Sequence, residues 1–163
     1  MSNRVDHQHL IEPLNVVLVA PEIAANTGNI GRTCVALGAS LWLVRPLGFH
    51  LTDRHLRRAG LDYWQHLNVR VVDDLRELTE RMGHRRVWLF STRGLTPNHA
   101  ASFSPGDALV FGSEGHGLPE AIRSEFADRV LRIPMAPEAR SLNLACAVAV
   151  GLFEAQRQIG FRA

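Results

Sequence analysis

Short apolar runs that alternate with helical segments are the feature that most constrains the fold of this chain. Residues 15–20 (NVVLVA) and 108–112 (ALVFG) are apolar at nearly every position, which is typical of strands buried on both faces of a parallel sheet. The other runs that indicate strands are residues 41–44, 69–72, 86–91 and 130–133. Helices are indicated over residues 26–37, 73–82, 119–126 and 142–158. The alternation predicts an α/β fold with a mostly parallel six-stranded sheet and flanking helices.

The length of 163 residues fits a single domain. We place this domain at residues 15–163, after a polar leader, residues 1–14, that has no periodicity and is expected to be flexible. Residues 92–106 are polar and rich in turn formers, so no strand is expected there. The apolar runs are far too short to cross a bilayer, and the chain start lacks the pattern of a signal peptide. These features predict a cytoplasmic protein that does not contact a membrane.

Cys34 and Cys146 are the only cysteines, and both fall in apolar helical segments, so we expect buried, reduced thiols. The cysteines and the eight histidines show no ligand spacing, and no metal site is expected. All 18 basic residues are arginines, which suit phosphate binding and base stacking. A GC-rich genome produces the same bias and the net charge is only +2, so composition does not establish an RNA partner.

Three loops that follow expected strands lie at the sheet edge where parallel sheets bind their ligands. In the first loop, residues 26–29 (NTGN) place asparagine and glycine at a helix start, where free backbone amides favour anions. Arg32 follows one helical turn beyond Gly28 and can face the same place. The alternative is plain helix capping, with Arg32 as a solvated surface charge. Gly38 is expected to end this helix.

The second loop, residues 112–119 (GSEGHGLP), has three glycines in six residues directly after a strand, which lets the backbone approach a ligand closely. The pattern is not GxGxxG, so a nicotinamide or flavin site is not expected. Glu114 is a candidate acceptor for an amine or an arginine. The alternative is a strand-to-helix turn that uses glycine for its geometry alone.

The third loop opens the stretch 133–150 (IPMAPEARSLNLACAVAV), where Pro134 and Pro137 exclude a regular helix. Ser141 is the expected N-cap of the helix that follows. Residues 144–153 are apolar at almost every position, so this helix is expected to be buried on nearly every face. A rigid loop with polar residues at the mouth of a buried helix indicates a binding site. The alternative is an ordinary helix start after a proline-marked loop.

Three segments, NTGNIGR (26–32), FGSEGHGLP (111–119) and the stretch 133–150, resemble the three motifs of the SPOUT RNA methyltransferases. The resemblance is to the SpoU branch, which methylates ribose 2'-hydroxyls. The segment RRAGLDYW (57–64) is similar to the small tRNA (cytidine/uridine wobble) 2'-O-methyltransferases. The resemblance covers residues 15–161, nearly the whole chain.

This resemblance implies a C-terminal trefoil knot, a homodimer, and S-adenosylmethionine as donor of a methyl group to the wobble nucleotide in the tRNA anticodon loop, without a metal. It implies a cofactor site at Phe90, Gly112, Ile133, Met135, Ser141 and Leu142. It implies that the reaction site contains Asn26, Arg32, Glu114, Ser141 and Asn143. Because a guanidinium stays protonated, we expect Arg32 to hold a phosphate or the developing alkoxide rather than to act as a base.

An RNA contact is expected where arginines adjoin aromatic residues, which offer charge and stacking faces to a single-stranded loop. These residues are Arg54, Arg57, Arg58, Tyr63 and Trp64. The alternative is a solvated basic segment beside two core aromatics.

Two other functions stay open at this point. Ser113 departs from the wobble enzymes, which often carry another residue there, so the first alternative is methylation of ribosomal RNA or of another tRNA position. The chain shows no extra RNA-binding domain, which favours tRNA. The second alternative is a non-catalytic nucleotide- or RNA-binding module. The joint presence of Arg32, Glu114, Ser141 and Asn143 argues against it.

Overall fold

The computed structural model describes residues 12–52, 54, 61–83 and 86–161. Its strands are β1 Asn15–Val19, β2 Ser40–Val44, β3 Val69–Val72, β4 Val87–Phe90, β5 Thr96–Pro97, β6 Ala108–Phe111 and β7 Val130–Arg132. They form one parallel sheet in the order β3-β2-β1-β6-β4-β7-β5. The predicted α/β class and parallel sheet are confirmed. The described residues form seven strands rather than six, because two residues of the segment 92–106 pair with β7 as the edge strand β5.

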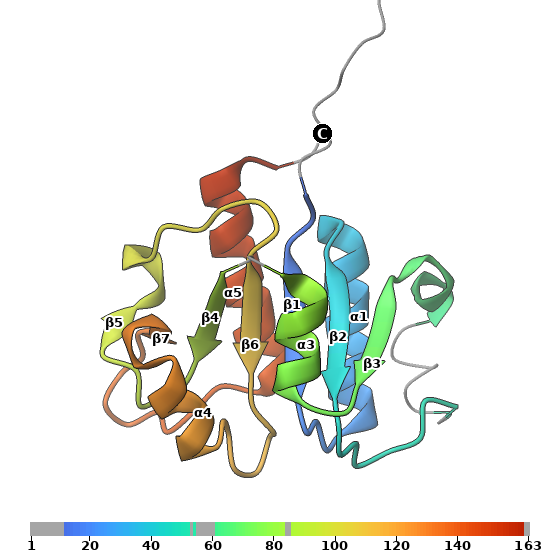
Figure 1. Ribbon diagram of the computed structural model, residues 1–163, viewed down its shortest axis with the longest axis horizontal. Coiled ribbons are helices and arrows are strands. Elements are labelled where there is room, and N and C mark those ends of the chain that lie inside the picture. The colour runs from blue at the N-terminus through green and yellow to red at the C-terminus, as the bar shows by residue number, and fades with distance from the viewer. Residues whose placement is uncertain (1–11, 53, 55–60, 84–85, 162–163) are drawn as a thin grey trace, which may run out of the picture.

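The helices lie in one layer on each face of the sheet. They are α1 Ala24–Leu37, α3 Leu75–Met82, α4 Glu120–Glu125 and α5 Leu144–Ile159, with the 3-10 turns η1 Leu61–His66, η2 Asn98–Ala100 and η3 Ala127–Arg129. α1 and α5 cover one face, and α3 and α4 cover the other (Figure 1). Neighbouring strand residues point to different layers, so Leu18 joins the core under α1 and α5 while Val19 joins the core under α3. Both faces are buried, as the continuous apolar runs predict.

The core under α1 and α5 fixes the helix starts above the carboxyl ends of the strands. Ile30 of α1 and Val148 and Leu152 of α5 are fully buried there. Each such side chain contributes roughly 1.5–3 kcal/mol to folding. α1 ends at Gly38 as predicted, with a φ of +64° that suits glycine.

Two helix starts differ from the expectation. α1 begins at Ala24, so residues 26–29 lie in its first two turns rather than in a loop before it, and Ile23 provides no side-chain cap. α5 begins at Leu144, and its N-cap is Asn143, whose Oδ1 accepts from the Ala145 amide at 2.9 Å. The prediction that Ser141 caps this helix is therefore wrong.

The last helix is not buried on nearly every face of the single chain, which corrects a second expectation. Val150 and Phe153 of α5 are 43% and 49% exposed. Cys146, expected to be buried, is also exposed, whereas Cys34 is buried as predicted, and both thiols are free. The sheet and α1 cover only one side of α5, so the remaining apolar residues face outward.

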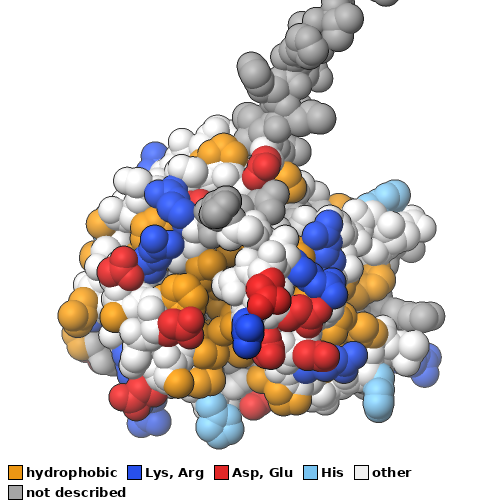
Figure 2. All heavy atoms as spheres, viewed as in Figure 1, with side chains coloured by type: hydrophobic (Ala, Val, Ile, Leu, Met, Phe, Trp, Pro, Cys, Tyr) orange, Lys and Arg blue, Asp and Glu red, His pale blue; other side chains and the backbone are white. Residues whose placement is uncertain are grey.

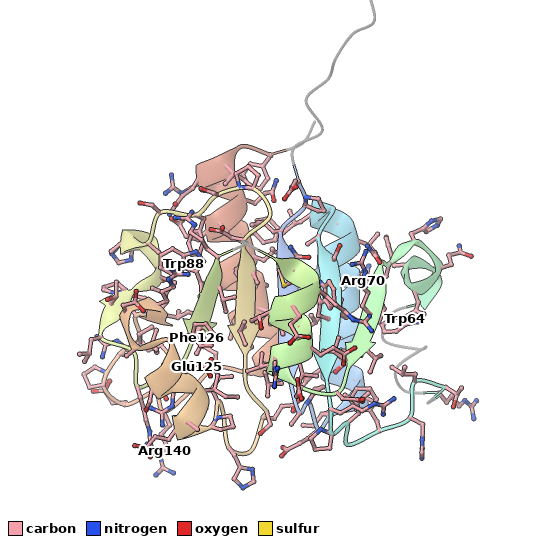
Figure 3. The ribbon with its side chains drawn as sticks, in the orientation of Figure 1. Trp64, Arg70, Trp88, Glu125, Phe126 and Arg140 are labelled. Carbon is pink, nitrogen blue, oxygen red and sulfur yellow. The ribbon has the colours of Figure 1, made fainter. Side chains whose placement is uncertain are left out.

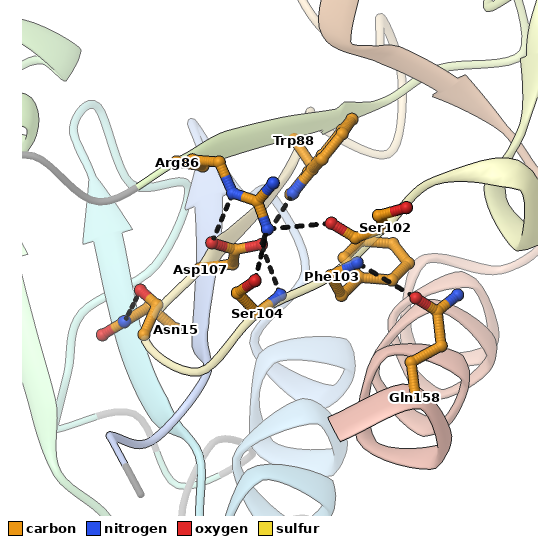
Figure 4. Close-up of polar contacts among 9 residues, drawn as sticks. Asn15, Arg86, Trp88, Ser102, Phe103, Ser104, Asp107 and Gln158 are labelled. Carbon is orange, nitrogen blue, oxygen red and sulfur yellow. Dashed lines mark hydrogen bonds and ion pairs between the residues drawn. The ribbon is translucent and has the colours of Figure 1, made fainter. Parts of the chain in front are cut away.

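A buried carboxylate organises the opposite, amino end of the sheet (Figure 4). Asp107 is 3% exposed and precedes β6. It accepts from Arg86 Nε at 3.2 Å and Nη2 at 3.0 Å, from Trp88 Nε1 at 2.9 Å and from the Ser104 amide at 2.9 Å. A charge this deeply buried requires such partners. The network joins the starts of β4 and β6, away from the edge where ligands are expected.

Charged side chains of both signs gather over α3 on the outer surface (Figure 2). Arg76 pairs with Glu80, and Arg81 with Glu77, each one helical turn apart. Within the described ranges, no helix has the length and apolar character required to cross a membrane.

Candidate active site

A cavity of about 770 Å³ opens at the carboxyl ends of β4, β6 and β7, a size that suits small-molecule ligands. Its apolar wall is made by Phe90, Phe111, Ile133, Met135, Leu142, Leu144 and Ala147. The rings of Phe90 and Phe111 stack with their centroids 4.6 Å apart. The residues expected to bind the cofactor all line this cavity: Phe90, Gly112, Ile133, Met135, Ser141 and Leu142.

The glycine loop after β6 is a tight turn that forms one wall of the cavity. Ser113 and Gly117 form an antiparallel bridge, with the Gly117 amide 2.9 Å from the Ser113 carbonyl oxygen. The Ser113 hydroxyl accepts from the His116 amide at 3.2 Å. A Cβ on Gly112 would lie 2.0 Å from the carbonyl carbon of Gly117, so only glycine allows this approach.

Glu114 ties the glycine loop to the start of α1. Its carboxylate accepts from the amides of Glu22 at 2.7 Å and Ile23 at 3.2 Å, and from Asn26 Nδ2 at 3.0 Å. The first amides of a helix have no partner within the helix, and a negative charge near them is favourable. Glu114 therefore stabilises the start of α1, where Ile23 offers no side-chain cap. Its partners in the structure are two backbone amides and the Asn26 side chain, whereas the sequence suggested an amine or an arginine.

Glu22 makes the reciprocal contact, from the segment before α1 to the glycine loop. Its Oε2 accepts from the Gly115 amide at 2.9 Å, and its Oε1 lies 3.5 Å from His116 Nδ1. Each of the two carboxylates thus binds the backbone of the loop that carries the other. Sequence reasoning missed Glu22, and no local signal reveals it, because its partner lies 93 residues away.

Two asparagines join the starts of α1 and α5. Asn143 Nδ2 donates to Asn26 Oδ1 at 3.1 Å, and Asn26 is buried in this position. Glu114, Asn26 and Asn143 therefore form one chain of hydrogen bonds that crosses all three motif segments. Ser141 lines the same cavity, and its hydroxyl makes no hydrogen bond with the described part of the chain.

Arg32 is the one expected reaction-site residue that the structure does not bring to the cavity. It lies on the exposed side of α1. Its guanidinium carbon lies 5.1 Å from the centroid of the Tyr63 ring, within the range of a cation–π contact. The cavity wall includes Asn26 of the same helix but not Arg32.

The expected RNA-binding residues separate into different environments. Tyr63 is 40% exposed beside Arg32. Trp64, the next residue of η1, is half-buried (Figure 3). A Cβ on Gly31 would lie 3.0 Å from Trp64 Cζ3, so Trp64 packs directly on α1. Arg54 is exposed. The remaining two, Arg57 and Arg58, lie outside the described residues.

The ionisable groups offer no metal site in the described ranges, where no three histidine, cysteine or carboxylate side chains gather. Burial raises the pKa of the Cys34 thiol, which therefore stays protonated and acts as an apolar core residue. The side chains that line the cavity thus offer amides, hydroxyls, carboxylates, guanidinium groups and the imidazole of His116.

Comparison with known proteins extends these observations. The chain matches the SpoU rRNA Methylase family over residues 13–153. A tRNA (cytidine(34)-2'-O)-methyltransferase of Saccharophagus degradans is 47% identical over 148 residues, covering 90% of this chain and 96% of that protein. One of Burkholderia ambifaria is 49% identical over 150 residues, with coverage of 90% and 96%.

Solved structures agree with these matches. A structure concerned with the 2-OH methylation of C/U34 on tRNA has a TM-score of 0.87 and 47% identity, covering 90% of this chain and 96% of that chain. A SpoU methyltransferase of Streptomyces viridochromogenes in complex with AdoMet has a TM-score of 0.80 and 28% identity, covering 90% and 58%. With the family match and these relatives over most of its length, the chain belongs to the SpoU rRNA Methylase family.

Proposed function

We propose that the protein transfers a methyl group from S-adenosylmethionine to the ribose 2'-hydroxyl of the wobble nucleotide of a tRNA. Relatives at 47% and 49% identity carry the name of this reaction at cytidine 34. The observation that carries the proposal is the cavity at the strand ends, to which all three motif segments contribute. The hydrogen bonds of Glu114, Asn26 and Asn143 hold these segments together. Fold alone does not select a reaction, so the support for methyl transfer comes from the residues of this site.

The cavity fits S-adenosylmethionine in size and in chemistry. Its volume of about 770 Å³ lies within the range of pockets that bind ligands of this class, roughly 300–1,000 Å³. The stacked rings of Phe90 and Phe111 and the side chain of Ile133 suit a flat adenine, and the glycine loop exposes backbone groups to ring nitrogens. When bound, the cofactor supplies a methyl group that is already activated on a sulfonium.

The residues of the chain then need to align the ribose and to assist the loss of its hydroxyl proton. Asn26, Ser141 and Asn143 offer hydrogen bonds at the cavity wall. Glu114 already receives three hydrogen bonds on its two oxygens, so it positions the site instead of accepting the proton. Arg32 does not line the cavity of its own chain, so in this proposal a second copy brings its guanidinium to the site, where it stabilises a phosphate or the developing alkoxide.

The active form in this proposal is a homodimer with the RNA bound across both copies. The exposed apolar residues Val150 and Phe153 of α5, with Leu142 before it, support a second copy at this face. α5 packs beside α1, the helix that carries Arg32. A C-terminal trefoil knot and a cytoplasmic location belong to the same proposal. Sedimentation velocity tests the dimer: a species of 18.1 kDa only would contradict it, and Phe153→Glu should dissociate it.

The reaction is tested with purified protein, methyl-labelled S-adenosylmethionine and unmodified tRNA. We expect label in a 2'-O-methyl group at the wobble nucleotide, mapped by nuclease digestion and mass spectrometry. Ribosomal RNA is assayed in parallel. Label at another tRNA position or only in ribosomal RNA would contradict the proposed target, and no label in any RNA would contradict the reaction.

Arg32→Ala tests the role of the guanidinium. Because Arg32 does not line the cavity, we expect S-adenosylmethionine to bind this variant with unchanged affinity. Methyl transfer should fall by at least 100-fold, since a lost charge contact in the transition state costs roughly 3 kcal/mol or more. Arg76→Ala, in an ion pair on α3, is the matched control. Full activity of Arg32→Ala would remove this residue from the mechanism.

A further inference from the structure

The arginines of the described residues differ in whether a carboxylate accompanies them. The arginines with a carboxylate within 4.0 Å are Arg45, Arg76, Arg81, Arg86, Arg129 and Arg157. Four others lie on the segments that form the cavity wall, and none of them pairs with a carboxylate of the described chain; we call them the rim arginines. They are Arg93, Arg123, Arg132 and Arg140.

The rim arginines differ in how close they lie to the cavity. Arg93 and Arg123 line the cavity, and Arg132 and Arg140 each directly precede a lining residue. Arg123 Nε donates to the Leu118 carbonyl at 3.2 Å, which leaves the two Nη groups available. Arg140 lies below α4, at the edge where the strands end (Figure 3).

The turn that carries Arg93 is anchored on β7. The Gly94 amide donates to the Ser91 carbonyl at 3.0 Å, and the Arg93 amide contacts the Ser91 hydroxyl at 3.2 Å. A Cβ on Gly94 would lie 2.6 Å from the carbonyl oxygen of Leu131, so the turn rests directly on that strand. This close approach fixes the backbone from which the free guanidinium of Arg93 extends.

The guanidinium groups around the cavity mouth have no carboxylate partner in the described chain. Three carboxylates, Glu120, Glu125 and Glu138, lie in the same segments, and none of them pairs with an arginine of the described ranges. The carboxylate of Glu114 is occupied by the start of α1. Unpaired guanidinium groups fixed at a cavity mouth favour an anionic ligand with several acceptor oxygens.

We propose that the rim arginines bind the phosphates on either side of the nucleotide that enters the cavity. Four guanidinium groups on three segments exceed what the single carboxylate of a cofactor can satisfy, whereas a single-stranded RNA loop presents one phosphate per nucleotide. This surface is separate from Arg32 and Tyr63. Neither of these two residues lines the cavity. The inference rests on the proposed function and adds the contacts that hold its substrate.

The test is the salt dependence of tRNA binding by the double variant Arg93→Gln/Arg140→Gln. Both side chains are exposed and unpaired, so the fold should not change. Removing two contacts to a single strand should reduce the slope of log K against log salt by roughly 1.4, which weakens binding about tenfold at 0.15 M salt. Calorimetric titration should give an unchanged affinity for S-adenosylmethionine. The control is the double variant Arg76→Gln/Arg157→Gln, which removes two arginines that already form ion pairs. We expect this control to keep the wild-type slope.

The outcomes separate this inference from the proposed function. If wild-type protein methylates tRNA but the Arg93→Gln/Arg140→Gln variant keeps the wild-type salt slope, the phosphate contacts of the rim arginines are refuted and the proposed function is not. Weaker cofactor binding with an unchanged slope also overturns it and assigns these arginines to the cofactor carboxylate. Wild-type protein that neither binds nor methylates any tRNA overturns the proposed function, and the rim inference with it.

Discussion

The carboxylate of Glu114 receives three hydrogen bonds from the start of α1, and Glu114→Gln removes its charge while keeping its shape. The new amide can accept with one oxygen only, and its NH₂ group faces backbone amides that also donate. A hydrogen bond to a charged group is worth about 1.5–3 kcal/mol against about 1 for a neutral one, and the helix-end charge adds about 0.3–1. Because the Glu22 and Ile23 amides are reached by water, we expect a net loss of about 1–2 kcal/mol.

Calorimetric melting and a methyl-transfer assay together check this prediction. For a chain of this size, 1 kcal/mol shifts the melting temperature by about 2–4 °C, so Glu114→Gln should melt about 4 °C lower. The turnover number should fall roughly tenfold, as 1.4 kcal/mol of misalignment at Asn26 and Asn143 would produce. The control, Glu125→Gln, changes an exposed carboxylate without a side-chain partner in the described chain (Figure 3). Equal melting temperatures for both variants would refute the role given to Glu114.

Two further predictions concern the cavity wall and the last helix. Gly112→Ala places a Cβ 2.0 Å from a backbone carbon of the glycine loop, so we expect calorimetry to show at least 100-fold weaker S-adenosylmethionine binding; wild-type affinity would contradict the geometry. The hydrogen bond from Arg157 lowers the pKa of Glu154 to about 2. Since the folded-state pKa lies below the unfolded value of about 4.3, this stabilisation is complete above pH 5 and is lost as the pH falls towards 2. Urea titrations of wild type and Glu154→Gln should therefore differ by up to about 1 kcal/mol at pH 7 and converge near pH 2; a constant difference would contradict the assignment.

The strands were predictable because a strand buried on both faces needs apolar residues at successive positions. The runs 15–20 and 108–112 meet this condition, and they contain β1 and β6. β5 has no such signal, because it consists of Thr96 and Pro97 and pairs only with β7. A proline in a two-residue strand is tolerated at a sheet edge, but no local pattern distinguishes it from a turn.

Residues that line the cavity could be chosen from the sequence, but their pairing could not. Ser141 and Asn143 are both good N-caps, so local preference cannot decide between them. The contact of Asn143 with Asn26, 117 residues earlier, accompanies the cap that the structure adopts. Likewise, α1 starts at Ala24 without a side-chain cap of its own, because Glu114 accepts from the amides before it. Both helix starts depend on distant parts of the chain, which single-sequence patterns do not contain.

The apolar character of α5 predicts more burial than the single chain provides. Its sequence predicts burial on nearly every side, yet the single chain buries Val148 and Leu152 and leaves Val150 and Phe153 about half exposed. An exposed apolar helix face next to a cavity is typical of an interaction site. The sequence pattern is consistent with the proposed dimer, in which a second copy covers the face that the sheet and α1 leave open. The apolar positions in the sequence of α5 therefore correspond to burial in the proposed dimer and not to burial in the single subunit.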